Sequence, residues 1–197
     1  MRKILQIGII YHSRTGRTKV IAEHIAIGAH NAGAKTYTFE CKEAIIRLDE
    51  LDSMDAIIFG CPTFMGSTSA EFKSFIDATG IKWSSQKWRN KIAAGFTNSG
   101  AWSGDKLCTI TQLAIFAAQH GMIWVGLDLK AGFSSAGSSQ DDLNRVGSWL
   151  GLMTQSNSDQ GLDISPPMSD LKTAEYFGQR IYSITKQFIN GKEYEQD

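Results

Sequence analysis

Cysteine is scarce in this sequence. The chain has three cysteines in 197 residues, Cys41, Cys61 and Cys108, and no two of them form a CxxC pair. An odd number at wide spacing excludes a disulfide framework and a cysteine-based zinc site, and it fits a protein of the reducing cytoplasm. We expect the three thiols to be small buried apolar side chains rather than reactive groups.

The sequence also lacks net charge and long apolar runs. It has 20 basic and 20 acidic residues, a balance that argues against binding to nucleic acid or to an anionic membrane. The apolar run that follows Met1–Lys3 is too short to span a membrane. No small-residue cleavage site follows it, so we interpret the run as a strand rather than as a signal peptide.

Patterns of hydrolytic and metal-dependent enzymes are missing as well. No cluster of His, Cys, Asp or Glu has the spacing of a metal site. No Ser/His/Asp order and no pair of carboxylates explains the sequence better than the loops described below. The adjacent acids Asp141 and Asp142 are interpreted as a solvated pair.

The hydrophobic pattern indicates one α/β domain over residues 1–197. The content of 42% hydrophobic and 20% charged residues is usual for a globular chain of this size. Strands and helices alternate five times, which predicts a doubly wound five-stranded parallel sheet in a three-layer sandwich. Residues 128–167 break the alternation, and this long polar segment is expected to be functional or mobile. Strands are predicted at residues 4–10, 34–41, 55–60, 91–97 and 122–127. Helices are predicted around residues 20–28, with Gly33 as the terminator, and at 45–51, 72–79, 107–117 and 171–188.

The first strand leads into a hydroxyl-rich loop, and a helix follows it. The loop matches neither the P-loop pattern GxxxxGK[ST] nor the dinucleotide fingerprint GxGxxG. Its hydroxyls and the free N–H groups of the helix N-terminus suit a phosphate. It resembles the Ser/Thr-x-Thr-Gly-x-Thr loop with which flavodoxins hold the phosphate of FMN. The alternative is an ordinary turn in which the side chain of Ser13 or Thr15 caps the helix. The candidate phosphate contacts are Ser13, Arg14, Thr15, Gly16, Arg17 and Thr18.

Two further loops follow the third and fourth predicted strands. Ligands of doubly wound folds bind beyond the carboxyl ends of the strands, so these loops should meet the hydroxyl loop at one edge of the sheet. Both loops combine backbone polar groups, apolar side chains and glycine, which suits the edge and the faces of an isoalloxazine ring. The candidate ring contacts are Pro62, Thr63, Phe64, Met65 and Gly66 in one loop, and Ser99, Gly100, Ala101, Trp102 and Gly104 in the other.

The order of four motifs resembles the FMN-dependent NAD(P)H:quinone reductases related to the tryptophan-repressor-binding protein WrbA. Residues 60–67 (GCPTFMGS) are similar to that family's GTPTRFGN loop, and residues 75–83 (FIDATGIKW) are similar to its FLDQTGGLW. His120-Gly121-Met122 matches the family's HGM, and residues 147–151 (GSWLG) stand where the family has G-x-PYG. The sequence departs from the family at Phe64, which replaces an arginine.

The resemblance implies FMN as the cofactor, NAD(P)H as the electron donor and a quinone or similar flat small molecule as the acceptor. It also implies a cytoplasmic homodimer or homotetramer. In such an enzyme His120 would lie near the flavin or the substrate and act in catalysis, and Trp83 would cover the substrate face of a neighbouring subunit's flavin. The neutral charge favours an enzyme that handles small molecules. The alternative is a flavodoxin-like electron carrier without a substrate of its own.

Overall fold

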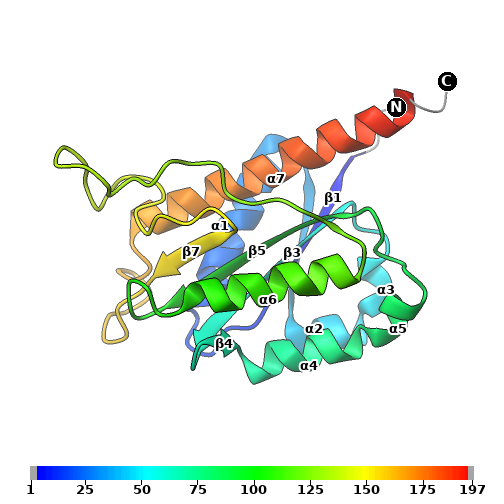
Figure 1. Ribbon diagram of the computed structural model, residues 1–197, viewed down its shortest axis with the longest axis horizontal. Helices are drawn as coiled ribbons and strands as arrows, with labels where there is room; N and C mark the ends of the chain where they lie inside the picture. The colour runs from blue at the N-terminus through cyan, green and yellow to red at the C-terminus, as the bar shows by residue number, and fades with distance from the viewer. Residues whose placement is uncertain (1–3, 195–197) are drawn as a thin grey trace.

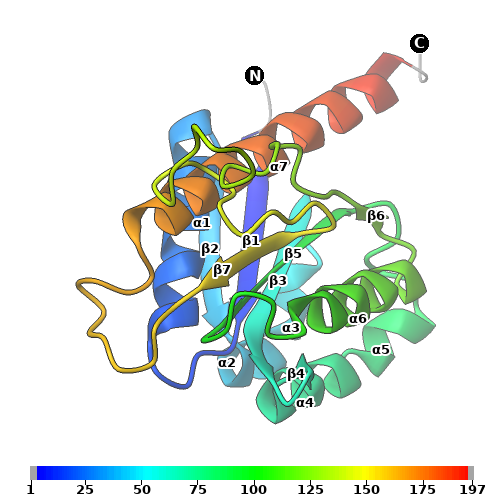
Figure 2. The same ribbon diagram turned by 60° about the vertical axis from the view of Figure 1, so that its left-hand side comes forward.

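One sheet organises the computed structural model, which describes residues 4–194. Strands follow the order β2-β1-β3-β5-β6, and neighbours along that path run parallel. β4 pairs antiparallel with β3, and β7 pairs parallel with β5 (Figure 2). The doubly wound parallel sheet predicted from the sequence is therefore confirmed. The strands are β1 (Gln6–Tyr11), β2 (Lys35–Glu40), β3 (Ala56–Phe64), β4 (Ser67–Thr68), β5 (Ile92–Ser99), β6 (Ile123–Trp124) and β7 (Leu152–Gln155).

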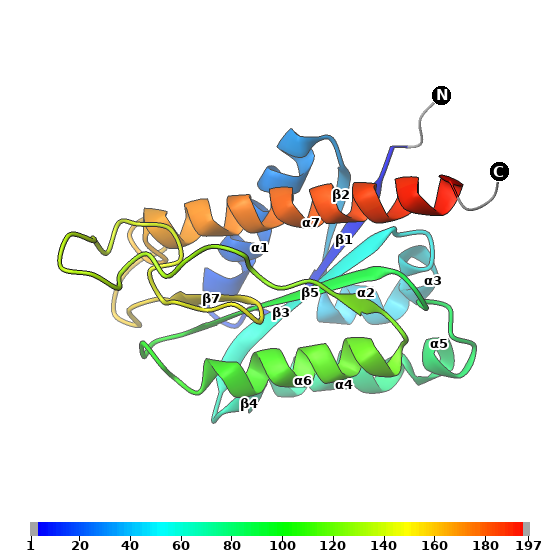
Figure 3. The ribbon, with the colours of Figure 1, turned by 45° about the horizontal axis from the view of Figure 1, so that its top comes forward.

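Helices cover both faces of this sheet. They are α1 (Arg17–Ala32), α2 (Cys41–Ile46), α3 (Leu48–Leu51), α4 (Ala70–Ala78), α5 (Gly80–Ser84), α6 (Lys106–Gln119) and α7 (Met168–Tyr194). Figures 1 and 3 show α1 and α7 on one face and α2, α4 and α6 on the other. Each side has its own buried cluster: Ile21, Ile25 and Phe177 belong to one, and Phe59 and Trp88 to the other. Among the described residues, no helix has the length and apolar character needed to cross a membrane.

Glycine allows α1 and α7 to approach each other closely. A β-carbon at Gly28 would overlap the backbone oxygen of Glu175, and one at Gly178 would overlap the backbone oxygen of Ile25. The first helix ends at Gly33, whose φ of 116° is the left-handed conformation that glycine adopts most easily. That terminator was predicted from the sequence. The contact at Gly28 was not, because it depends on a helix far away in the chain.

The fifth predicted strand is split. Only Ile123 and Trp124 of residues 122–127 form β6, and they pair with the beginning of β5. The end of β5 pairs instead with β7, which lies inside residues 128–167. Residues 128–167, which the sequence predicted to be functional or mobile, therefore contain a strand of the sheet, because the chain leaves the sheet after β6 and returns to the same edge.

Two other local predictions need correction. The loop expected after residue 60 is largely strand, since β3 continues to Phe64 and forms a hairpin with β4. The short helix expected at 45–51 is two helices, α2 and α3. Cys41 and Cys61 are buried as expected, but Cys108 is exposed on α6.

Candidate functional site

A cavity of about 430 Å³ opens beyond the carboxyl ends of β1, β3 and β5. The three loops predicted to converge do meet there, and the chain after β7 supplies a fourth side. In the described part of the chain, no group of three acidic, histidine or cysteine residues is placed to hold a metal ion. The cavity is lined by Arg14, Thr15, Arg17, Thr18, Pro62, Thr63, Phe64, Asn98, Ser99, Gly100, Ser156 and Ser158.

The hydroxyl loop leaves polar groups without partners. The N-cap of α1 is Gly16, with φ of 88°, and no side chain caps the helix. The alternative in which Ser13 or Thr15 caps α1 is therefore wrong. Ser13 Oγ and Arg17 Nε are buried and have no hydrogen-bond partner. Buried donors rarely stay unpaired in proteins, so the loop has the hydrogen-bonding capacity for a ligand.

Arg17 ties the hydroxyl loop to the chain after β7. Its guanidinium donates to Thr15 Oγ1 at 3.1 Å and to the carbonyl oxygens of Asn157 at 3.0 Å and Ser158 at 3.1 Å. It also donates to the carbonyl oxygen of Gln160 at 2.6 Å. The guanidinium Nε has no partner among these bonds, so it is a donor that another acceptor could use.

The second loop rests on a buried chain of hydroxyls. Thr63 Oγ1 lies 2.8 Å from the hydroxyls of both Thr97 and Thr109, and Thr97 donates to the carbonyl of Cys61 at 2.7 Å. This chain joins β3, β5 and α6 and fixes the floor of the cavity. Thr63 therefore lines the cavity, as predicted, although its hydroxyl already forms hydrogen bonds within the protein.

The tip of the second loop points away from the cavity. Met65 and Gly66 have φ of 48° and 75° and form the turn between β3 and β4. Met65 is fully exposed, and neither residue lines the cavity. Their predicted ring contact stays a prediction, and in the single chain the hairpin carries both residues outside the lining of the cavity. Phe64, 37% exposed, does line the cavity.

The third loop curls around a buried lysine. Lys106 Nζ donates to Ser99 Oγ at 3.0 Å and to the carbonyls of Ala101 at 2.7 Å and Trp102 at 2.8 Å. Ser99 and Gly100 line the cavity, whereas Ala101 and Gly104 shape the loop behind them. Gly104 has φ of 56°, and a β-carbon there would overlap Ser99 Oγ.

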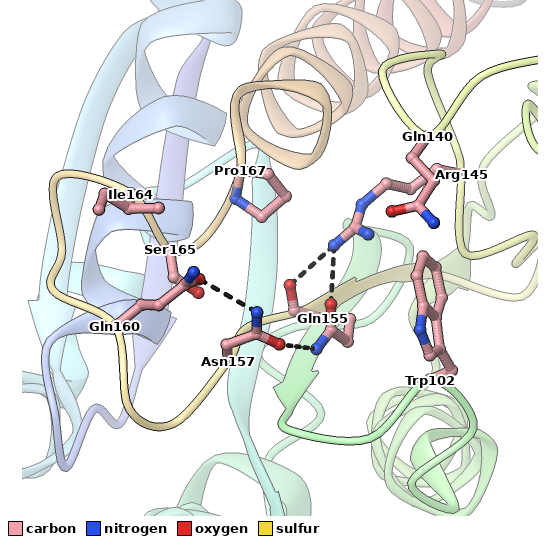
Figure 4. A pocket seen from close by; sticks show the side chains of 9 residues that line it. All are labelled: Trp102, Gln140, Arg145, Gln155, Asn157, Gln160, Ile164, Ser165 and Pro167. Atoms are coloured by element: carbon pink, nitrogen blue, oxygen red, sulfur yellow. Dashed lines mark hydrogen bonds between the residues drawn. The ribbon is translucent and has the colours of Figure 1, made fainter.

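Trp102 does not line the 430 Å³ cavity. It lines a neighbouring pocket of about 290 Å³, shown in Figure 4. The Arg145 guanidinium lies over its ring, with 4.5 Å between Cζ and the ring centroid. Arg145 is held in turn by Asp170, at 2.8 and 3.0 Å, and by Gln155. In the single chain Trp102 contacts Arg145 and does not line the cavity, and its predicted ring contact stays a prediction.

Three lining residues were missed from the sequence. Asn98 is the last residue but one of β5, and its Oδ1 accepts hydrogen bonds from Thr154 and Ser156, both at 2.9 Å. Ser156 and Ser158 follow β7. The signal was present, since an apolar run at 149–153 precedes polar residues just as the other strands do.

His120 lies far from these loops. It follows α6, whose 14 residues span about 20 Å from the loop edge to the opposite edge of the sheet (Figure 1). Its ring stacks on Trp88 with 4.6 Å between centroids, and its Nε2 lies 3.0 Å from Thr79 Oγ1. Burial lowers the pKa of His120 to about 4, so the ring is neutral near pH 7. His120 does not line the cavity of the single chain, and its predicted place near the ligand stays a prediction.

Trp83 lies at the same distant edge. It belongs to α5, its side chain is 53% exposed, and it does not line the cavity. Lys82, the residue before it, pairs with Asp49 and Asp52 and fixes α5 against α3. Trp83 of one chain can therefore approach a cavity only on another copy.

Comparison with known proteins gives matches over almost the whole chain. The model of the NADPH-dependent FMN reductase family matches residues 47–136. Flavodoxin FldP of Pseudomonas aeruginosa is 38% identical over 91% of this chain and 96% of its own length. An NAD(P)H dehydrogenase (quinone) of Archaeoglobus fulgidus is 29% identical over 91% of this chain and 96% of its own.

A solved structure has the same architecture. The crystal structure of the WrbA-like flavodoxin from Agrobacterium tumefaciens aligns with a TM-score of 0.69 and 32% identity. The alignment covers 93% of this chain and 99% of that one.

Proposed function

The chain belongs to the WrbA-like flavodoxin family, and from this we propose that it is an FMN-dependent oxidoreductase. The proposed reaction passes hydride from NAD(P)H, by way of FMN, to a quinone or a similar flat acceptor. The FMN reductase family match and the quinone dehydrogenase relatives support the reaction class. Cysteine usage supports a cytoplasmic location.

The observation that carries the proposal is the pair of unpartnered donors in the hydroxyl loop. Ser13 Oγ and Arg17 Nε are buried without a hydrogen-bond partner beside the uncapped N-terminus of α1. A phosphate monoester has the acceptor oxygens that these donors lack, and the helix N-terminus favours its negative charge. The residues present therefore fit the phosphate of FMN.

The other loops fit the rest of the cofactor. Thr63, Phe64, Ser99 and Gly100 would contact the ring, and Asn98 and the serines after β7 would face the sugar chain. When bound, FMN supplies the hydride chemistry, which no side chain of the protein can supply. The protein binds and orients the ring between two loops whose backbones are fixed from below by Thr97 and Lys106.

No catalytic acid is assigned to the chain. His120, the sequence-based candidate, is buried about 20 Å away along α6 and has a pKa of about 4. Donor and acceptor would use the same open side of the cavity in turn, which predicts ping-pong kinetics.

We further propose that the working form is a homodimer or a homotetramer. Trp83 is a half-exposed aromatic residue at the edge opposite the cavity, with the exposed Ile81 beside it. In an oligomer, Trp83 of one copy would cover the ring held by another. Sedimentation velocity of the wild type and of Trp83→Ala tests this assignment, and a monomeric wild type would refute it.

An electron carrier is the second candidate function. A relative with 38% identity is named a flavodoxin, and that name favours a protein that exchanges electrons with other proteins. The formal net charge of zero counts against this candidate, because a large net charge of one sign is what steers such encounters over a distance. We therefore prefer the enzyme.

Absorbance spectroscopy separates the candidates. FMN is added to the purified protein, then NADPH or NADH without oxygen, and finally benzoquinone. Rapid bleaching by a nucleotide and recovery with benzoquinone are expected for the enzyme, whereas binding without bleaching would favour the carrier. A protein that binds no flavin would refute both.

Phosphate recognition is tested with two flavins. Ser13→Ala should raise the Kd for FMN about tenfold, because one charge-assisted hydrogen bond is lost, and it should leave the Kd for riboflavin unchanged. Ser74→Ala, which removes an exposed hydroxyl on α4, is the matched control and should change neither value. Equal losses for both flavins would exclude Ser13 as a phosphate contact.

A further inference from the structure

Lys106 is a fully buried lysine at the start of α6. Lysine side chains are almost never fully buried unless their charge is paired or hydrogen-bonded. Here the ammonium has three short hydrogen bonds, to Ser99 Oγ and to the carbonyls of Ala101 and Trp102. Because an ammonium has three donors, all of them are used by one loop. The side chain of Lys106 thus stabilises the loop, although its backbone is part of the helix.

These bonds fix the orientation of two peptide groups. The carbonyls of Ala101 and Trp102 point inward to Nζ. In a planar trans peptide the N–H of the next residue points the opposite way, so the N–H groups of Trp102 and Ser103 are turned away from Lys106. The loop therefore has its acceptors on the inner side and two donors on the outer side.

A turn with unusual backbone angles closes the loop and brings Lys106 beneath it. Gly104 and Asp105 both have positive φ, 56° and 53°, and they lead the chain back beneath the loop. Asp105 is not glycine, so the left-handed region is strained for it. Such strain persists where surrounding contacts hold the backbone, and the Lys106 bonds to Ser99, Ala101 and Trp102 lie next to this turn.

Charged groups from two other segments act on Lys106. Burial lowers the pKa of its ammonium to about 8, Asp170 of α7 opposes this shift, and Arg145, from the segment before β7, adds to it. Asp170 and Arg145 form a buried ion pair with each other at 2.8 Å. With Lys106 protonated, the three charges leave one net positive charge behind the loop.

We propose that Lys106 is a positioning residue of the flavin site, whose ammonium sets the shape and the donor direction of the Ser99–Gly104 loop against the ring. This inference rests on the proposed function, since it concerns how the same cavity holds FMN. Ser99 and Gly100 line the cavity directly, so a change in the loop reaches the ligand without Lys106 touching it. The positive charge behind the loop also favours the binding of ligands that carry negative charge.

Binding of riboflavin isolates this role, because riboflavin has the ring but no phosphate. The Kd values of FMN and riboflavin are measured by fluorescence titration for wild type, Lys106→Met, Lys106→Arg and the control Lys73→Met, whose lysine is exposed on α4. Lys106→Met should raise both Kd values about tenfold or more, since it leaves three acceptors unpaired. Lys73→Met should change neither.

The pH profile distinguishes positioning from packing. If flavin binding requires the charged lysine, affinity is highest below the pKa of about 8 and falls as the pH rises through it. Wild type should therefore bind riboflavin more weakly at about pH 9.5 than at about pH 6.5, whereas arginine stays charged over that range and Lys106→Arg should show no such fall. Circular dichroism establishes which variants are folded.

Two results would overturn the inference. One is a folded Lys106→Met protein that binds riboflavin like the wild type. The other is a wild-type Kd that is the same at both pH values, which decides the matter even if Lys106→Met does not fold. Normal flavin binding by the wild type with either result refutes only the role of Lys106, whereas a wild type that binds no flavin refutes the proposed function as well.

Discussion

His120 should make the protein less stable in mild acid. The side chain is 2% exposed and is enclosed by the rings of Trp88 and Phe116, with Thr79 at its Nε2. Its Nδ1 is buried without a partner. Burial lowers its pKa from 6.5 to about 4, because an imidazolium there would lose its hydration. The unfolded chain thus takes up a proton at a pH where the folded chain does not.

The size of this effect follows from proton linkage. Between pH 6.5 and pH 4 the unfolded state binds more protons than the folded state, so the free energy of unfolding falls as the pH falls. A difference of about 2.5 pKa units corresponds to about 3 kcal/mol over the whole range, and to about 2 kcal/mol between pH 7 and pH 5. Above the unfolded value of 6.5 the contribution is almost constant.

Urea unfolding of wild type and His120→Gln near pH 7 and pH 5 measures this loss of unfolding free energy. Glutamine can still bond Thr79 but takes up no proton, so wild type should lose about 2 kcal/mol more than the variant on acidification. His30→Gln, which removes an exposed histidine of α1, should keep the full wild-type loss. Equal losses for wild type and His120→Gln would refute the reasoning, and hydride transfer by the variant should be unchanged near pH 7.

Further substitutions test the packing around the site. Gly28→Ala should lower stability by about 3 kcal/mol, because its methyl group would overlap the backbone of Glu175, whereas Gly80→Ala meets nothing within 4 Å and should change little. Thermal unfolding by circular dichroism compares the two, and equal melting temperatures would contradict the packing of α1 on α7. Asp170→Asn should cost about 3–5 kcal/mol in urea unfolding, because it leaves the Arg145 guanidinium buried without its carboxylate. Adding Arg145→Met should restore much of that stability, and a double variant no more stable than Asp170→Asn would count against this account.

Local patterns identified most of the elements and three sides of the cavity. The apolar run of β1, the hydroxyl loop and Gly33 lie within one stretch of chain, and hydrophobic period and turn chemistry are local properties. The parallel topology then places the carboxyl ends of successive strands at one edge. Thr15, Thr63 and Ser99 therefore lie around one cavity, as expected.

The direction of side chains and the structure of residues 128–167 depend on contacts between residues far apart in the sequence. Trp102 turns toward Arg145 because of a cation–π contact across 43 positions in the sequence, and β7 joins the sheet by pairing with β5. His120 matches a family motif, yet its place behind Trp88 follows from the length and direction of α6. The sequence alone thus determined the order of the elements and the chemistry of their loops, because these follow from local periodicity. Only the tertiary structure decided which side chains reach the cavity, because burial and pairing are set by residues far apart in the chain.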